Sequence, residues 1–109
     1  MGTDEIRRVA REIADRFHPE SILLFGSQAR GDAGLESDVD LLVVMDYQGN
    51  SVDQALRIRQ QLGRVGWPLD VIVRSRQEIE RRVRLGDFFL RDALREGKVL
   101  YESADIRVD

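Results

Sequence analysis

Three aspartates and a glycine–serine pair are the residues whose types and spacing indicate chemistry. Gly26-Ser27 ends one apolar run, and ten residues later Asp38 and Asp40 open a second. Side chains along a strand alternate between its faces, so Asp38 and Asp40 are expected on the same face. Two carboxylates about 4–5 Å apart repel by roughly 3–4 kcal/mol at an effective dielectric near 20, and such a pair commonly shares a proton or holds a cation. The pattern predicts a divalent-metal site beside a phosphate site.

The Gly26-Ser27 turn is the candidate phosphate site. A glycine at a strand end lets the backbone approach a ligand, and Ser27 at the start of a helical turn offers N–H groups and a hydroxyl. The alternative is an ordinary glycine turn with a serine cap. The segment from Gly26 to Gly31 is not a Walker A loop, because Gly31 is followed by Asp32-Ala33 and not by lysine and serine or threonine.

Asp70 and Arg30 are the remaining candidates. Asp70 is second in the otherwise apolar run 69–73, where a buried charge would be costly without a metal or a basic partner. If this strand neighbours that of Asp38, Asp70 could complete the metal site and accept a proton from an attacking hydroxyl. The alternative is a strand-end aspartate that faces water or pairs with an arginine. Arg30 could bind a triphosphate or form a structural ion pair.

Apolar periodicity predicts the elements that position these residues. The expected helices cover residues 3–17, 51–62, 75–85 and 88–96, with a helical turn at 27–30; the expected strands cover 21–25, 38–45, 69–73 and 98–101. The strand from Asp38 is apolar on both faces after Asp40, which indicates a central position in the sheet. The alternating order predicts one domain of two or three layers.

Capping patterns and helical spacing predict the helix starts and the buried faces. Ser51 with Gln54, and Ser75 with Glu78, are typical of capping boxes. The residues expected to face inward are Val52, Ala55, Leu56 and Leu62 in one helix and Leu90, Ala93 and Leu94 in another. Trp67-Pro68 and Phe88-Phe89 are interpreted as core or interface residues before a base-stacking platform.

Composition limits the class of protein. The 109 residues, 42% hydrophobic and 34% charged, are expected to form one domain over residues 1–102 with a polar tail over 103–109. No cysteine is present, which excludes disulfides, thiolate metal sites and thiol catalysis. No signal-peptide pattern and no apolar run near the ~20 residues of a membrane helix occurs, so a cytoplasmic protein without membrane contact is expected.

Charge is unevenly distributed along the chain. The net charge of −3 argues against broad, non-specific binding to nucleic acid. Five arginines nevertheless fall within residues 74–84. Codon bias is the simpler explanation, and a surface for an acidic partner is the alternative, since arginine binds phosphate and carboxylate in a forked geometry.

In combination, these motifs resemble the DNA polymerase β-like nucleotidyltransferase superfamily. Gly26-Ser27, ten residues, then Asp38-x-Asp40, with Asp70 on the next strand, match its pattern. The segments 26–31 and 37–41 and the closing segment 96–102 are similar to its minimal nucleotidyltransferase branch. The resemblance implies an α+β fold with a small mixed sheet and helices packed mainly on one face.

The same resemblance implies roles for the candidate residues. Asp38, Asp40 and Asp70 would be catalytic residues and ligands of two Mg²⁺ ions, with Asp70 also the base. Gly26 and Ser27 would bind the phosphates of a nucleoside triphosphate, with ATP the expected donor, and Arg30 stays an additional candidate for the nucleotide. Members of this branch are typically antitoxins encoded beside HEPN-type ribonuclease toxins, and some are similar to enzymes that attach AMP to a toxin tyrosine.

Three hypotheses stay open at this point. The first is an Mg²⁺-dependent adenylyltransferase that modifies a hydroxyl of a partner toxin and releases pyrophosphate. The second is a non-catalytic antitoxin that masks its partner by binding. The third is nucleotidyl transfer to a small molecule such as an aminoglycoside. Self-association is left open by the sequence.

Overall fold

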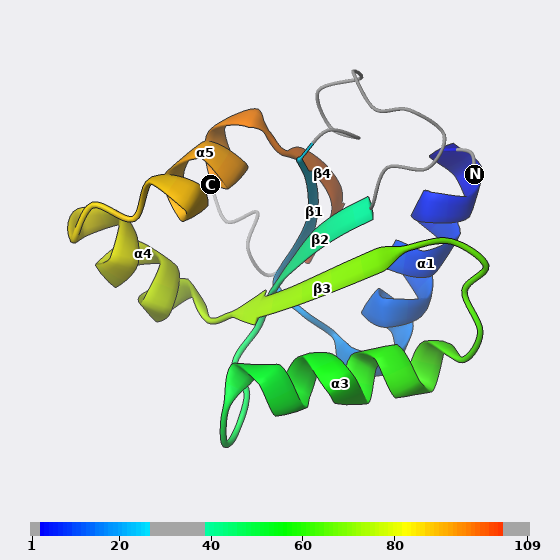
Figure 1. Cartoon of the computed structure of the whole chain (residues 1–109). Coiled ribbons are helices and arrows are strands. Elements are labelled where there is room, and N and C mark those ends of the chain that lie inside the picture. Colours follow the sequence, from blue (N-terminus) through cyan, green and yellow to red (C-terminus); the bar gives the residue numbers. More distant parts are fainter. Residues whose placement is uncertain (1–2, 27–38, 104–109) are drawn as a thin grey trace.

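The computed structural model describes residues 3–26 and 39–103 (Figure 1). Along the chain the elements are α1 (Thr3–Phe17), β1 (Ser21–Phe25), β2 (Val39–Val44), α3 (Ser51–Leu62), β3 (Leu69–Arg74), α4 (Arg76–Arg84), α5 (Phe88–Glu96) and β4 (Lys98–Glu102). The predicted strand 21–25 and the predicted helices 3–17, 51–62 and 88–96 are confirmed to the residue, and the other described elements differ by one residue at one or both ends. The predicted helical turn at 27–30 lies outside the described residues.

The four strands form one mixed sheet in the order β3-β2-β1-β4. β1 is antiparallel to both β2 and β4, whereas β2 and β3 are parallel. A parallel pair needs a crossover connection, and α3 supplies it between β2 and β3. β2 is an internal strand with five of its six residues buried, which confirms its predicted central position.

Helices α1 and α3 cover one face of the sheet and enclose the larger core. Ile13 of α1 and Ile58 of α3 are fully buried against strand residues that point to this face. Those strand residues are Ile22, Leu24, Val39, Leu41, Val43, Leu69 and Val73. Burying a large aliphatic side chain contributes about 1.5–3 kcal/mol, so this face dominates the stability of the fold.

Helices α4 and α5 lie on the other face, so the sheet is a middle layer (Figure 1). A smaller core joins Ile79 of α4 and Leu90 and Ala93 of α5 to strand residues that alternate with those of the first core. These are Leu23, Phe25, Leu42 and Val44. The α+β class and the mixed sheet are confirmed. The expectation that the helices pack mainly on one face is wrong: two helices pack on each face, because β1 and β2 carry apolar side chains on both sides.

The N-cap of α3 differs from the prediction by one residue. The cap is Asn50, whose side chain accepts a hydrogen bond from the N–H of Asp53 at 2.8 Å, and not Ser51. Val52 and Leu56, predicted to face inward, are 74% and 54% exposed. Gln54 and Ile58 are the buried residues of this helix, and Ala55 and Leu62, also predicted to face inward, are partly buried against the core.

In the second layer, the predicted capping box of α4 is present. The Ser75 hydroxyl accepts from the N–H of Glu78, and the Glu78 carboxylate accepts from the N–H of Ser75. In α5, Leu90 and Ala93 are buried as predicted, whereas Leu94 is 38% exposed. Within the described residues, no helix combines the length and apolar character needed to cross a membrane.

Candidate active site

Asp40 and Asp70 lie side by side on the parallel strands β2 and β3. The two residues are directly paired in the strand register. Neighbouring strands are about 4.7–4.9 Å apart. Asp40 alternates with Val39 and Leu41, which both belong to the α1–α3 core, so its side chain is on the α4–α5 face. Asp70 lies between Leu69 and Val71 and is on that face for the same reason. The expectation that the strand of Asp70 adjoins the strand of Asp40 is confirmed.

The loop between α3 and β3 and the end of α3 fix where β3 begins. The N–H of Val39 donates to the carbonyl of Pro68 at 3.0 Å, which starts the pairing of the two strands. The Arg59 guanidinium of α3 donates to the carbonyl of Leu69, one residue before Asp70. These contacts hold Asp70 in register with Asp40.

Gly26 directly follows β1 and abuts the Asp40 carboxylate. Its φ is +78°, a left-handed conformation that favours glycine. A Cβ at this position would approach Asp40 Oδ2 to 2.5 Å. Phe25, the preceding residue, is paired with Asp40 across the β1–β2 ladder. Position 26 therefore needs glycine both for its backbone conformation and for the space that Asp40 occupies.

A pocket of about 590 Å³ opens over these residues, and we call it the carboxylate pocket. Its walls come from the end of β1, the starts of β2 and β3, and helix α5. The lining includes Phe25, Gly26, Asp40, Asp70, Phe89, Asp92 and Glu96. Three of the predicted site residues thus share one cavity: Asp40 of β2, Asp70 of β3, and Gly26, which follows β1.

The α5 wall of the carboxylate pocket was not predicted from the sequence. Phe89, interpreted as a core or interface residue, is 55% exposed and lines the cavity. Its ring meets that of Phe25 edge-on, with centroids 5.5 Å apart and an interplanar angle of 85°. Asp92 and Glu96 follow Phe89 at three- and four-residue spacing, so they share its side of the helix. That spacing is the signal from which this wall could have been found.

The reason given for Asp70 in the sequence analysis needs correction. Asp70 is exposed, not buried in an apolar strand, so no desolvation cost has to be relieved by a metal. Its exposure follows from its position, because β3 is an edge strand and its start borders the carboxylate pocket. The carboxylate is accessible to a ligand, which a proton acceptor requires.

Two of the three predicted metal ligands, Asp40 and Asp70, are among the described residues. Asp40 and Asp70 supply the oxygen ligands that Mg²⁺ prefers, from one face of adjacent strands. The part of the chain that the structure describes contains no group of three acidic or histidine side chains placed to hold a metal. Asp38, the third predicted ligand, lies outside that part, as do Ser27 and Arg30. The donor chemistry of the described pair fits the ion.

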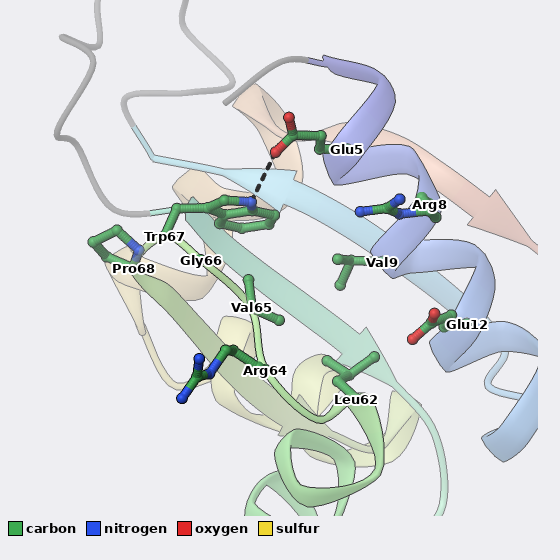
Figure 2. A pocket seen from close by; sticks show the side chains of 10 residues that line it. All are labelled: Glu5, Arg8, Val9, Glu12, Leu62, Arg64, Val65, Gly66, Trp67 and Pro68. Carbon is green, nitrogen blue, oxygen red and sulfur yellow. Dashed lines mark hydrogen bonds between the residues drawn. The ribbon is translucent and has the colours of Figure 1, made fainter.

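A larger pocket, of about 960 Å³, lies on the opposite side of the sheet (Figure 2). It is bounded by α1 and by the segment 62–68, and it contains none of the predicted site residues. The Trp67 indole N–H donates to Glu5 Oε2 at 3.0 Å across its mouth, and Arg8 and Glu12 also line it (Figure 2). This cavity is the larger of the two, but the predicted site residues Gly26, Asp40 and Asp70 line the carboxylate pocket, which is therefore the candidate active site.

The clearest perturbed titratable pair is structural and lies past the other ends of β2 and β3. The Tyr47 hydroxyl donates to Glu78 Oε1 at 2.5 Å. This hydrogen bond, then burial and the charge of Glu78, raise the pKa of Tyr47. Burial alone would raise the pKa of Glu78, but hydrogen bonds from Ser75 and Tyr47 outweigh it and lower that pKa. The pair joins the connection after β2 to α4 and is remote from the carboxylate pocket.

Comparison with known proteins identifies relatives of similar length. The chain is 37% identical over 83 residues to "Putative protein adenylyltransferase MJ0604" of Methanocaldococcus jannaschii, covering 75% of this chain and 78% of that protein. It is 33% identical over 77 residues to "Putative protein adenylyltransferase MJ1379" of the same organism, covering 65% and 77%.

Solved structures share the fold. A crystal structure described as a putative nucleotidyltransferase from Sulfolobus solfataricus is 30% identical, with a TM-score of 0.57 over 72% of this chain and 70% of that one. A crystal structure of a toxin–antitoxin with AMP-PNP has a TM-score of 0.58 at 20% identity, over 97% of this chain and 77% of that one. Residues 6–100 match the model of the nucleotidyltransferase domain, so the chain belongs to this family and is a nucleotidyltransferase.

Proposed function

We propose that this protein transfers AMP from ATP to a hydroxyl of a partner protein. The observation that carries the proposal is the in-register pair Asp40 and Asp70, which opens with Gly26 into one pocket. A nucleotidyltransferase needs acidic side chains beside a site where phosphates can approach the backbone, and these three residues supply both. The similarity to proteins named as adenylyltransferases of proteins supports the choice of donor and acceptor class.

Asp38, Asp40 and Asp70 are proposed to hold Mg²⁺, with two ions expected. The ions would neutralise the triphosphate and polarise the phosphoryl group that is transferred. Gly26 and Ser27 are proposed to bind the phosphates, since Gly26 leaves the backbone uncovered beside Asp40. Arg30 is proposed to add a charged contact to the nucleotide.

The reaction is a displacement at the α-phosphorus of ATP. The acceptor hydroxyl oxygen forms a bond to this phosphorus while the bond to the bridging oxygen breaks, and pyrophosphate leaves. Asp70 accepts the hydroxyl proton, because it is the exposed carboxylate at the edge of the pocket and an acceptor can reach it. The products are pyrophosphate and an acceptor carrying AMP on its oxygen.

The acceptor is proposed to be a tyrosine of a HEPN-type ribonuclease toxin, so the protein would act as a cytoplasmic antitoxin. The carboxylate pocket has an α5 wall on one side, and the described residues place no further domain over it. We propose that a partner protein supplies a further wall. A solved structure that shares this fold is a toxin–antitoxin complex, which is consistent with such a partner.

The test combines the purified protein with ATP, Mg²⁺ and the product of the neighbouring gene, followed by intact-mass spectrometry. The expected result is an acceptor that gains one or more AMP groups, and peptide mapping then locates the modified tyrosine. The double variant Asp38→Asn, Asp40→Asn is expected to lose transfer while binding its partner as before. An unmodified acceptor that is nevertheless bound would count against adenylylation.

Two other outcomes would identify the competing functions. Neutralisation of the partner by the double variant would favour an antitoxin that acts by binding alone. Pyrophosphate release that depends on an aminoglycoside, and not on the partner protein, would favour transfer to a small molecule. The acidic residues Asp92 and Glu96 in the pocket wall make a cationic acceptor the one to include.

A further inference from the structure

We propose that the corner between α4 and α5 is a docking surface for an acidic segment of a partner protein. We define this α4–α5 corner by Arg81, Arg82, Arg84, Leu85, Phe88 and Arg91. It projects from the sheet at the turn between the two helices (Figure 1). The proposal extends the proposed function, because it gives the acceptor protein a place to bind.

Charge at the corner is opposite to that of the whole protein. Residues 81–91 carry four arginines and one aspartate, a net charge of +3, in a chain of net charge −3. The carboxylate, Asp87, is already engaged: one oxygen accepts from the N–H of Leu90 at 3.0 Å, and the other is 3.7 Å from Arg82. Among the described residues, Arg81 and Arg84 have no ion-pair partner, so their charge is available to an acidic ligand.

Two large apolar side chains are exposed among these arginines. Leu85 is 79% exposed and Phe88 is 65% exposed, although a chain of this size gains stability by burying such residues. The Arg91 guanidinium lies over the Phe88 ring, 4.9 Å from its centroid. Aromatic and arginine side chains around an apolar centre are typical of protein interfaces.

The corner is held in one conformation by backbone hydrogen bonds. The N–H groups of Leu85, Gly86 and Asp87 donate to the carbonyls of Arg81, Val83 and Arg82, respectively, at 2.9–3.1 Å. Gly86 has a φ of +92°, which allows the sharp turn. Leu85 and Phe88 are thus presented on a defined turn, and less conformational entropy is lost on binding.

An acidic protein segment fits this surface better than a nucleic acid does. The exposed apolar group at the turn is a leucine, which cannot stack on a base, and a face of Phe88 is covered by Arg91. A segment with aspartate or glutamate beside an apolar side chain would satisfy both the arginines and Leu85.

The corner adjoins the carboxylate pocket through α5. Phe88 belongs to the corner, whereas the next residue, Phe89, lines the pocket with Asp40 and Asp70. A partner seated on the corner would place neighbouring groups near the pocket mouth.

The test measures binding of a labelled peptide rich in glutamate, with a central Phe-Leu pair, by fluorescence anisotropy on the full chain. R81E/R84E is expected to weaken binding about tenfold or more, since like charges would then face each other. The matched control R7E/R11E changes two exposed arginines of α1 by the same charge and is expected to bind as the unmodified protein does.

A second pair of variants tests the contribution of Leu85 and Phe88, the exposed apolar side chains of the α4–α5 corner. L85S/F88S is expected to weaken peptide binding several-fold, whereas V52S/L56S, which alters the exposed apolar pair of α3, is expected to leave it unchanged. No peptide binding by the unmodified protein, or equal losses in a variant and its control, would overturn the proposal. Tighter binding of a single-stranded oligonucleotide at the corner would replace it with a nucleic-acid surface.

Transfer assays separate this proposal from the function it extends. In R81E/R84E, the KM for the protein acceptor is expected to rise about tenfold while the KM for ATP stays unchanged. If the unmodified protein transfers no AMP but the peptide results hold, the proposed reaction fails and the docking surface stands. If transfer proceeds and R81E/R84E has an unaltered acceptor KM, the docking surface fails alone.

Discussion

The two faces of the sheet are built from the same strands but differ in composition. The α1–α3 face gathers thirteen of the buried hydrophobic residues in the described part of the chain, and the α4–α5 face gathers seven. On the second face, Asp40 and Asp70 occupy the starts of β2 and β3, and Phe89 is half-exposed. In a chain of 109 residues, one face can supply most of the stability while the other exposes polar groups. Substitutions on the two faces should therefore have different effects.

The largest effect is expected on activity, from Asp40→Asn. The change keeps the volume beside Gly26 and removes the charge, so kcat should fall by on the order of 10³-fold. The free energy of unfolding should change far less than kcat, because Asp40 belongs to neither hydrophobic core. Initial rates of AMP transfer and urea denaturation measure the two quantities. A variant that loses activity because it unfolds would contradict the division between the faces.

On the other face, Ile13→Ala should affect stability. Ile13 is fully buried in the larger core, and truncation to alanine should lower the free energy of unfolding by about 2–5 kcal/mol. Transfer per folded molecule should be unchanged below the melting temperature, because Ile13 is remote from the carboxylate pocket. Thermal denaturation and an activity assay on the same sample measure both. A fall in kcat without a fall in stability would show that this face also contributes to catalysis.

Phe89→Ala tests whether the α5 wall of the carboxylate pocket contacts the nucleotide. If a nucleobase stacks on this ring, its loss should raise the KM for ATP by roughly 5- to 150-fold, which corresponds to about 1–3 kcal/mol of stacking. The control is Phe88→Ala, which removes the adjacent ring outside the pocket and should leave the KM for ATP as it was. Equal KM values for the two variants would exclude Phe89 as a stacking platform.

The smallest effect is expected from Tyr47→Phe. Loss of the hydrogen bond to Glu78 should cost about 0.5–1.5 kcal/mol, towards the low end because the pair is partly exposed. The pKa of Tyr47 is raised in the fold, so its stabilisation is present below the ordinary tyrosine pKa and is lost as pH rises through the folded value. The pKa of Glu78 is lowered, so its stabilisation is lost as pH falls through the folded value.

Both limbs of the pH–stability curve should therefore become shallower in Tyr47→Phe. Denaturation midpoints measured from acid to alkaline pH would show this, with the rate of AMP transfer at neutral pH as the control, expected to be unaltered. An unchanged alkaline limb would mean that the Tyr47 hydroxyl is not shared with Glu78 in solution.

Local sequence signals predicted most of the helices and strands, because each of these elements has an apolar periodicity or a capping pattern within its own residues. The continuous apolar run of β2 indicated a central strand, and Ser75 with Glu78 marked the start of α4. The α3 cap was wrong because Asn50 and Ser51 are both good caps, and only packing against the sheet decides between them. Packing against the sheet also decides which side of the helix is buried, and it leaves Val52 and Leu56 exposed.

For the site, the sequence predicted residues but not their surroundings. Gly26, Asp40 and Asp70 were predicted and meet in one pocket. The α5 wall was missed, because the position of Phe89 depends on a sheet order in which β1 lies between β2 and β4. For Asp70 the sequence left burial and exposure as alternatives, because an apolar run does not show which strand is at an edge, and the structure shows exposure. The roles of Asp38, Ser27 and Arg30, the tail over 103–109 and the cytoplasmic location stay predictions.

The pairing of Asp40 with Asp70 also has an evolutionary consequence. A strand reverses its sides with every added residue, so a single-codon insertion between Leu69 and Asp70, with Leu69 kept in place, would turn this acid towards the α1–α3 core. The same insertion in the preceding turn, near Gly63 or Gly66, where a side chain would meet open space, could be absorbed. Length variation among descendants of this gene should accumulate before Pro68 and be purged within the six codons that follow it.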